Sequence, residues 1–238
     1  MASPFKDKKL LIHSINQFLS RHESFMKNQG DRISDYFEMS CFNDVVSFYK
    51  ASGFQVRPMN LAGGEFIYKL KPSGHAENFS YFEINGKSDY EVHHNLSIES
   101  KIGDAVFYTP DVSVVIKDSI VKGKIPSYYD GKRAHSYCSS GNLQTFVEEK
   151  HMNPFPELLF NFTGLLLSFM PQVLTKDGVT GRGAKHLAPT LALSGNGNTH
   201  CHAIKKVIEQ RYDTNIIFEL FYKHSQLYSK KYVKTRIF

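Results

Sequence analysis

The chain has 238 residues, of which 41% are hydrophobic and 22% charged, so it can bury a sizeable core as one large domain or one domain with a small appendage, and disorder is not expected. Its three scattered cysteines (Cys41, Cys138 and Cys201) are too few for a disulfide framework, and no secretory leader pattern opens the sequence; both points favour a reducing, cytoplasmic setting. The net charge of +6 is concentrated at residues 6–9 and 228–236. This excess of positive charge favours a polyanionic partner.

Two helices are predicted at the beginning of the chain and form a helical hairpin. Apolar residues recur at helical spacing across residues 8–27, and a break follows at 28–31. A second helix is predicted from Ile33 to Ala51, with Gly53 in the position of a left-handed C-terminal cap.

The middle of the chain changes to a β pattern. Segments rich in β-branched and aromatic residues, separated by Gly, Asn and Ser, predict strands within 64–71, 79–86, 88–100 and 104–116. Asn85-Gly86 is a strong hairpin signal, so the sheet is expected to be at least partly antiparallel. Residues 122–142 resemble a loop, and a further strand is predicted from Leu143 to Lys150.

The remaining segments alternate between helix and strand. A helix is predicted over 153–174, with Asn153 as its cap, Pro154 at its first position and Glu157 in its first turn. Pro171 breaks this apolar run, leaving it shorter than the roughly 20 residues that a membrane span needs. A strand at 187–194, a helix at 202–212 and a strand at 214–222 follow, and predict one α/β domain.

Charged residues in the strand 143–150 suggest a functional site. Because side chains alternate between the faces of a strand, Phe146, Glu148 and Lys150 share one face, while Val147 and Glu149 share the other. A buried lysine and carboxylate are costly unless they pair or meet a ligand. Glu148 and Lys150 are therefore candidates for a shared site.

A second acid interrupts the apolar run at 104–116. Asp111 follows Pro110, and proline belongs at a strand start, an edge or a bulge, where a sheet can open to a ligand. Two carboxylates that lie close together repel each other and become favourable when a hard divalent cation lies between them. Asp111 and Glu148 are thus candidate ligands of one cation.

These residues resemble the PD-(D/E)xK nuclease superfamily, with Pro110-Asp111 on one strand and Glu148-Glu149-Lys150 on the next. The resemblance implies a restriction-endonuclease-like fold, an α/β fold in which helices flank a mixed central sheet. It covers about 31–172 of a single domain spanning 1–238, preceded by a helix at 1–30 and followed by a strand-helix-strand extension at 173–238. The Tyr-rich stretch 118–142 is interpreted as an insertion or hairpin near the site.

The resemblance also implies a catalytic set. Asp111, Glu148 and the main-chain carbonyl of Glu149 would bind Mg²⁺, for which Mn²⁺ can substitute, and Lys150 would act on the attacking water or on phosphate oxygens. Strand alternation makes the Glu149 side chain a bystander. We therefore expect Glu148→Ala to abolish cleavage and Glu149→Ala to be tolerated.

Members of the superfamily commonly carry an acid on the first core helix. Here Glu38 is the chosen candidate, with Asp35 and Asp44 on the same predicted helix as alternatives. The choice among these three stays open in the sequence.

Further residues are candidates for contacts with substrate. One of His93 and His94 must share a face with the site if their strand neighbours that of Asp111. The turn 194–200 is interpreted first as a tight connection between a strand and a helix, and second, together with Lys205 and Lys206, as a candidate for contact with a nucleic-acid backbone. The adjacent His200, Cys201 and His202 are interpreted as a polar helix start rather than a zinc site.

The predicted function is a metal-dependent endonuclease that cleaves DNA in preference to RNA, in a setting such as restriction or defence against phage. The resemblance further implies a homodimer, and leaves room for a companion protein or an activating ligand. Two alternatives compete with it: an inactive relative that binds nucleic acid or a protein, and an unrelated α/β protein in which both motifs are coincidental.

Overall fold

A mixed sheet of seven strands organises the chain. The computed structural model describes residues 8–27, 29–86, 88–103, 106–124, 134–175, 183–221 and 233–237. In spatial order the strands are β1 (Gln55–Met59), β2 (Tyr81–Asn85), β3 (Tyr90–His94), β6 (Val112–Ile116), β9 (Leu143–Lys150), β11 (Thr190–Leu193) and β12 (Asn215–Ile217). Neighbours are antiparallel from β1 to β9 and parallel from β9 to β12. The protein is thus a mixed α/β structure.

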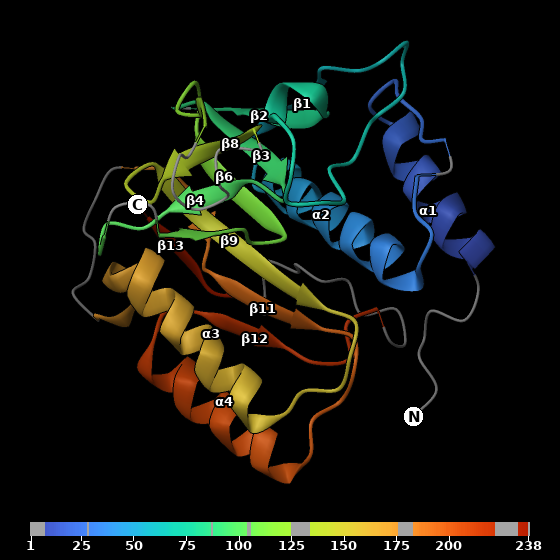
Figure 1. The fold of residues 1–238 in the computed structure, drawn as a ribbon. Helices are drawn as coiled ribbons and strands as arrows, with labels where there is room; N and C mark the ends of the chain where they lie inside the picture. The colour runs from blue at the N-terminus through green and yellow to red at the C-terminus, as the bar shows by residue number, and fades with distance from the viewer. Residues whose placement is uncertain are drawn as a thin grey trace.

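Four helices flank this sheet, two on each face (Figure 1). They are α1 (Lys8–Ser20), α2 (Ile33–Ala51), α3 (Pro156–Phe169) and α4 (Thr199–Arg211). One hydrophobic core lies between the sheet and α1 and α2, and a second lies between the sheet and α3 and α4. Among the described residues, no helix has the length and apolar character needed to cross a membrane.

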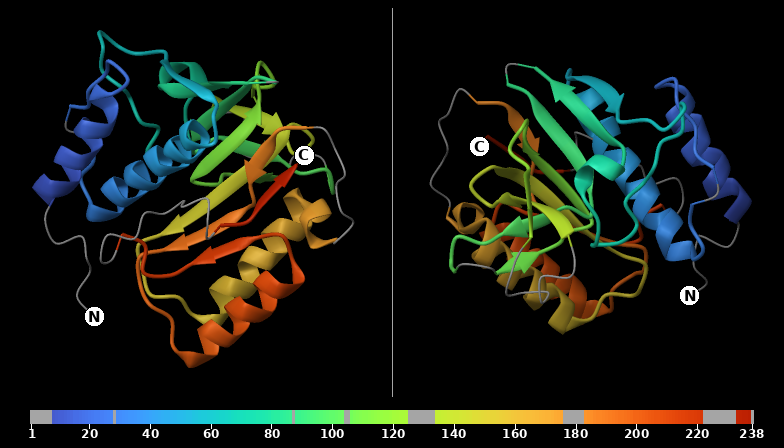
Figure 2. Two further views of the ribbon diagram at one scale, coloured as in Figure 1. Left: turned by 180° about the vertical axis from the view of Figure 1, so that it is seen from behind. Right: turned by 45° about the horizontal axis from the view of Figure 1, so that its top comes forward.

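Two smaller sheets accompany the main one (Figure 2). The four-stranded sheet has the order β5 (Phe107–Tyr108), β4 (Ser97–Glu99), β8 (Ala134–Ser139) and β7 (Val121–Lys124), and β10 (Lys185–Leu187) pairs with β13 (Thr235–Ile237). Short 3-10 turns occur at Ala76–Asn78 and Pro171–Leu174. Since β4 continues the chain from β3, and β5 precedes β6, the four-stranded sheet is tied directly to the centre of the main sheet.

Local signals explain the ends of α2. Asp35 Oδ2 accepts hydrogen bonds from the backbone N–H groups of Asp31 and Arg32, both at 2.9 Å, which ties the two residues before the helix to its first turn. The helix ends before Gly53, whose φ of 93° lies in the left-handed region as predicted. Between these ends, α2 is buried on most sides, since α1 covers it as well as the sheet.

The other helices depart from their predicted bounds. α1 ends at Ser20 rather than near residue 27, and the chain then turns through Glu23, whose φ is 55°. α3 begins at Pro156 and not after Asn153 and Pro154, because Phe155, as the residue before a proline, is held extended at φ −139° and ψ 157°.

Several predicted strands were wrong in extent. Residues 64–71 form no strand, and the edge strand β1 lies earlier in the chain. The predicted strands 88–100, 104–116 and 187–194 each divide between two sheets, and 214–222 shortens to β12. The loop predicted at 122–142 contains β7, from Val121, and β8, and their antiparallel pairing bears out the interpretation of 118–142 as a hairpin. The hairpin predicted at Asn85-Gly86 is confirmed by the β2–β3 pairing.

A pair of glycine variants tests this packing. A Cβ on Gly195 would lie 2.6 Å from Asn153 Cα and 2.7 Å from Met152 O, just after β9, so backbone must move. Gly195→Ala should lower the free energy of unfolding by about 1–3 kcal/mol. Gly164 is exposed on α3, with open space around a new Cβ. Gly164→Ala should therefore raise the free energy of unfolding by up to about 1 kcal/mol. Urea unfolding followed by circular dichroism measures both changes, and equal effects would contradict the packing.

Candidate active site

The predicted trio of Asp111, Glu148 and Lys150 meets where β6 and β9 separate. Val112 pairs with Val147, and this register continued by one residue sets Asp111 opposite Glu148, on the same face. Lys150 Nζ lies 3.2 Å from Asp111 Oδ2 and 2.5 Å from Glu148 Oε1. Both carboxylate oxygens therefore lie within about 6 Å of each other, close enough to become ligands of one cation after small side-chain movements.

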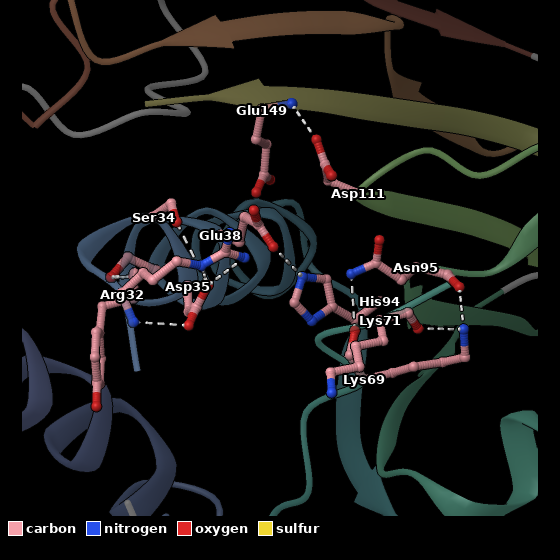
Figure 3. A network of polar contacts seen from close by, with 12 residues as sticks. Arg32, Ser34, Asp35, Glu38, Lys69, Lys71, His94, Asn95, Asp111 and Glu149 are labelled. Carbon is pink, nitrogen blue, oxygen red and sulfur yellow. Dashed lines mark hydrogen bonds and ion pairs between the residues drawn. The ribbon is translucent and has the colours of Figure 1, made fainter. Parts of the chain in front are cut away.

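The Asp111 carboxylate also binds the backbone of β9. Asp111 Oδ2 accepts a hydrogen bond of 2.6 Å from the backbone N–H of Glu149 (Figure 3). At this position the Asp111 side chain, and not the backbone of β6, is the partner of β9. Pro110, which has no N–H to donate, lies just before β6, which begins at Val112, and so close to a strand start as predicted. Burial, and then the charge of Glu148, raise the pKa of Asp111 to about 7.

Lys150 is held between the two carboxylates as a cation. Burial acts to lower its pKa, but the charges of Asp111 and Glu148 outweigh burial and raise it above the ordinary value. The ammonium therefore stays protonated at neutral pH. It contacts one oxygen of each carboxylate.

Tyr108 is a site residue that sequence reasoning missed. It lies on β5, and its hydroxyl donates a hydrogen bond to Glu148 Oε2, the oxygen that Lys150 does not contact. Its ring packs against Phe169 at 5.4 Å between centroids, and burial, followed by the charge of Glu148, raises the pKa of the phenol well above its usual range. A tyrosine three residues before Asp111 was the available signal, but strand alternation within 104–116 gave no reason to single it out.

Glu149 occupies the opposite face of β9, as alternation predicted, but its side chain is not exposed. The residue is 2% exposed, and among the described residues neither carboxylate oxygen has a hydrogen-bond partner. Its carboxylate points towards that of Glu38 on α2 (Figure 3). Burial, and then the charge of Asp111, raise the pKa of Glu149 well above its usual range.

Glu38 is the acid of α2 that joins the site. Burial raises its pKa to about 6, and the charges that act on it include Lys150 and Glu148. Asp35 is instead committed to the start of α2, where backbone hydrogen bonds and Arg32 outweigh burial and lower its pKa. Asp44 lies six residues after Glu38 on α2, closer to the C-terminal end of the helix.

The two histidines of β3 separate to opposite faces. His94 Nε2 lies 4.0 Å from Glu38 Oε2, and burial lowers the pKa of this ring to about 3. His93 pairs with Glu91 at 2.9 Å and stacks on Tyr81 at 4.6 Å between centroids. By strand register, His93 is the histidine that shares a face with Asp111 and Glu148, whereas His94 faces Glu38 on the opposite side, with Glu149.

The candidates on α4 have structural contacts. Lys205 Nζ lies 2.5 Å from Glu209 Oε2 and donates to Ile216 O at 2.5 Å, so it fastens α4 to β12. Asn198 caps the helix by accepting a hydrogen bond of 2.9 Å from Cys201 N. His200, Cys201 and His202 thus lie at a helix start as predicted, although α4 begins at Thr199 and not at residue 202. Lys206 is exposed on the same helix. Residues 6–7 and 228–232 of the basic ends lie outside the described residues.

Two carboxylates of the site share one cationic partner. The Lys150 ammonium contacts carboxylate oxygens of Asp111 and Glu148, and the charge of Glu38 also acts to raise the pKa of Asp111. Within the described ranges, no three His, Cys, Asp or Glu side chains form a ready-made metal site. A cation would therefore have to displace Lys150 from between Asp111 and Glu148, and oxygen ligands of this kind suit Mg²⁺.

Comparisons with protein-family models, curated proteins and solved structures give no match. The chemistry of the site therefore has to be argued from its own residues.

The raised carboxyl pKa values predict an unusual dependence of stability on pH. Asp111 and Glu38 bind protons more tightly in the folded chain than in the unfolded one, so without metal the free energy of unfolding should fall as pH rises from about 4 to about 7. Because Mg²⁺ competes with these protons, it should raise the melting temperature at pH 8 and have little effect at pH 5. At 100 times its Kd, the gain is about 2.7 kcal/mol.

Differential scanning fluorimetry with and without Mg²⁺ measures this difference, and Asp111→Asn serves as the control because it removes one acidic ligand. A Mg²⁺ effect that is the same at pH 5 and pH 8, or the same in Asp111→Asn, would contradict cation binding by these carboxyls.

Proposed function

We propose that this chain is a metal-dependent endonuclease that hydrolyses phosphodiester bonds of nucleic acid, DNA in preference to RNA. The observation that carries the proposal is the meeting of Asp111, Glu148 and Lys150 at the point where β6 and β9 separate. An acid after a proline and a Glu-x-Lys pattern, far apart in sequence, come together in space as the PD-(D/E)xK motif requires.

The arrangement of the sheet supports the same proposal. Antiparallel strands up to β9 carry the acids and the lysine, parallel strands follow, and α2 and α3 cover opposite faces. This order fits the restriction-endonuclease-like fold that the sequence resemblance implies. We include membership of that fold in the proposal.

Each residue would have a definite task. Asp111, Glu148 and the main-chain carbonyl of Glu149 would hold Mg²⁺ or Mn²⁺, with Glu38 as a further acid from α2. A bound Mg²⁺ would supply charge neutralisation at the scissile phosphate and lower the pKa of a water molecule. Tyr108 would hold Glu148 in place by its hydrogen bond to Oε2.

Lys150 would act on the attacking water or on the phosphate. Without a metal, the charges of Asp111 and Glu148 raise its pKa and keep it protonated at neutral pH. A metal that held these two carboxylates would take away that support and free the Lys150 side chain. It would then orient or deprotonate the attacking water, or stabilise a phosphate oxygen.

The wider setting is part of the proposal. A homodimer would supply two sites for two strands, restriction or defence against phage is a suitable role, and a companion protein or an activating ligand can be required. The competing reading is a nuclease fold without catalysis, which would bind nucleic acid but leave it intact.

A cleavage assay tests the proposal directly. Plasmid, linear and single-stranded DNA and RNA are incubated with the wild type, Asp111→Asn and Lys150→Met, in Mg²⁺, Mn²⁺ or EDTA. Cleavage of DNA should require the metal and fall by about 10²–10⁴-fold in both variants, since each removes a group acting at the reacting phosphate. Binding without cleavage in every condition would favour the inactive module, and cleavage that survives EDTA would exclude the proposed chemistry.

The two adjacent glutamates form a matched pair of variants. Glu148→Gln should lower cleavage by at least about 10²-fold, because it replaces a charged ligand of the metal with a neutral amide. Glu149→Gln keeps the shape of a buried side chain whose pKa is already raised, so cleavage should stay within a few-fold of wild type. Single-turnover rates at saturating Mg²⁺ measure both. A larger loss in Glu149→Gln than in Glu148→Gln would reverse the assignment of the metal ligand.

A further inference from the structure

Lys69 is a buried lysine whose ammonium binds backbone carbonyls. The residue is 4% exposed, and its Nζ donates to Lys71 O at 2.8 Å, Pro72 O at 2.7 Å and Asn95 O at 2.6 Å. An ammonium has three donors, and all three are used here. Burial lowers its pKa to about 8, so holding this charge inside the protein has a cost that its contacts must offset.

Asn95 completes a reciprocal contact with Lys69. Its side-chain Nδ2 donates to Lys69 O at 2.8 Å, while its own carbonyl accepts from Lys69 Nζ (Figure 3). Asn95 has a φ of 51°, in the left-handed region, where asparagine is among the residues that tolerate the conformation. This turn ends β3 and sends the chain into β4, so the Lys69–Asn95 contact fixes the place where the two sheets part.

The same asparagine reaches the candidate active site through its backbone. Asn95 N–H donates to Asp111 O at 2.9 Å, directly beyond the last β3–β6 pair of His94 with Val112. Asp111 then accepts the Glu149 N–H and the Lys150 ammonium through its side chain. Hydrogen bonds therefore run from the Lys69 ammonium through Asn95 to the main-chain carbonyl of Asp111, the residue whose carboxylate lies in the site.

We propose that Lys69 is a positioning residue for Asp111: through Asn95 it sets the backbone of the acid that would hold the metal. Lys69 contacts neither substrate nor metal, and its role in catalysis rests on the proposed nuclease function. Its role in placing Asp111 does not depend on that function. A lysine suits the task because one ammonium can tie three carbonyl groups from two separate segments, which no neutral aliphatic side chain of similar length can do.

The test compares three variants of the full chain. Lys69→Met keeps the aliphatic stem and removes the three hydrogen bonds. Asn95→Gly keeps the left-handed turn and its N–H but removes the side-chain bond to Lys69, and serves if Lys69→Met does not fold. Lys234→Met is the matched control, since Lys234 Nζ also donates to backbone carbonyls, those of Glu209 and Tyr212 at the end of α4.

Two readouts are measured on each variant. Hydrogen exchange of the Asn95 and Glu149 amides reports the two bonds to Asp111 without any need for activity. Mn²⁺ titration followed by electron paramagnetic resonance, together with the Mg²⁺ concentration for half-maximal DNA cleavage, reports the metal site. In Lys69→Met both amides should exchange about tenfold faster and Mn²⁺ should bind about tenfold more weakly, with cleavage partly restored at high Mg²⁺. Asn95→Gly should change both readouts in the same direction.

The outcomes separate the two proposals. Wild-type exchange at both amides in Lys69→Met, or equal acceleration in Lys234→Met, overturns the positioning role even if the chain is a nuclease. If the wild type neither binds Mn²⁺ nor cleaves DNA, the nuclease proposal fails, and faster exchange restricted to Lys69→Met and Asn95→Gly still supports the placement of Asp111 by Lys69.

Discussion

The hydrogen bond from the Glu149 amide to the Asp111 carboxylate is the contact on which the rest of the site depends. Up to Val147, β9 pairs with β6 through the backbone; beyond it, a side chain meets the strand instead. Because the Asp111 carboxylate replaces the backbone of β6 as the partner of β9, the two strands separate here and an acid lies at the point of separation. Strand geometry then brings Glu148 and Lys150 to the same place.

The opening concentrates negative charge where little water reaches it. Carboxyl groups arrive from the loop before β6, from β9 and from α2, and burial shifts the pKa values of Asp111, Glu38 and Glu149 upwards. The folded chain tolerates this set by protonation and by the Lys150 ammonium. A divalent cation would relieve the electrostatic repulsion in such an arrangement, which supports the proposed metal site.

The sequence predicted the parts of the site that follow from local rules. Strand alternation sorted Glu148 and Lys150 from Glu149, and the bounds of β9 were correct at both ends. Tyr108 and Lys69 could not be found in this way, since their partners are set by how two sheets join and lie 40 and 26 positions away along the chain. The strand predicted at 64–71 is absent for the same reason. Its backbone N–H groups donate to side chains of other segments, such as Ser80 and Gln29, rather than to a neighbouring strand.

Glu148 is held from two directions at once. Lys150, on its own strand, contacts one oxygen, and Tyr108, on the four-stranded sheet, contacts the other. The carboxylate thus bridges the main sheet and the four-stranded sheet, so its orientation depends on how the two sheets are placed relative to each other. A substitution that moved β5 relative to β9 would therefore change the position of the Glu148 carboxylate without altering β9 itself.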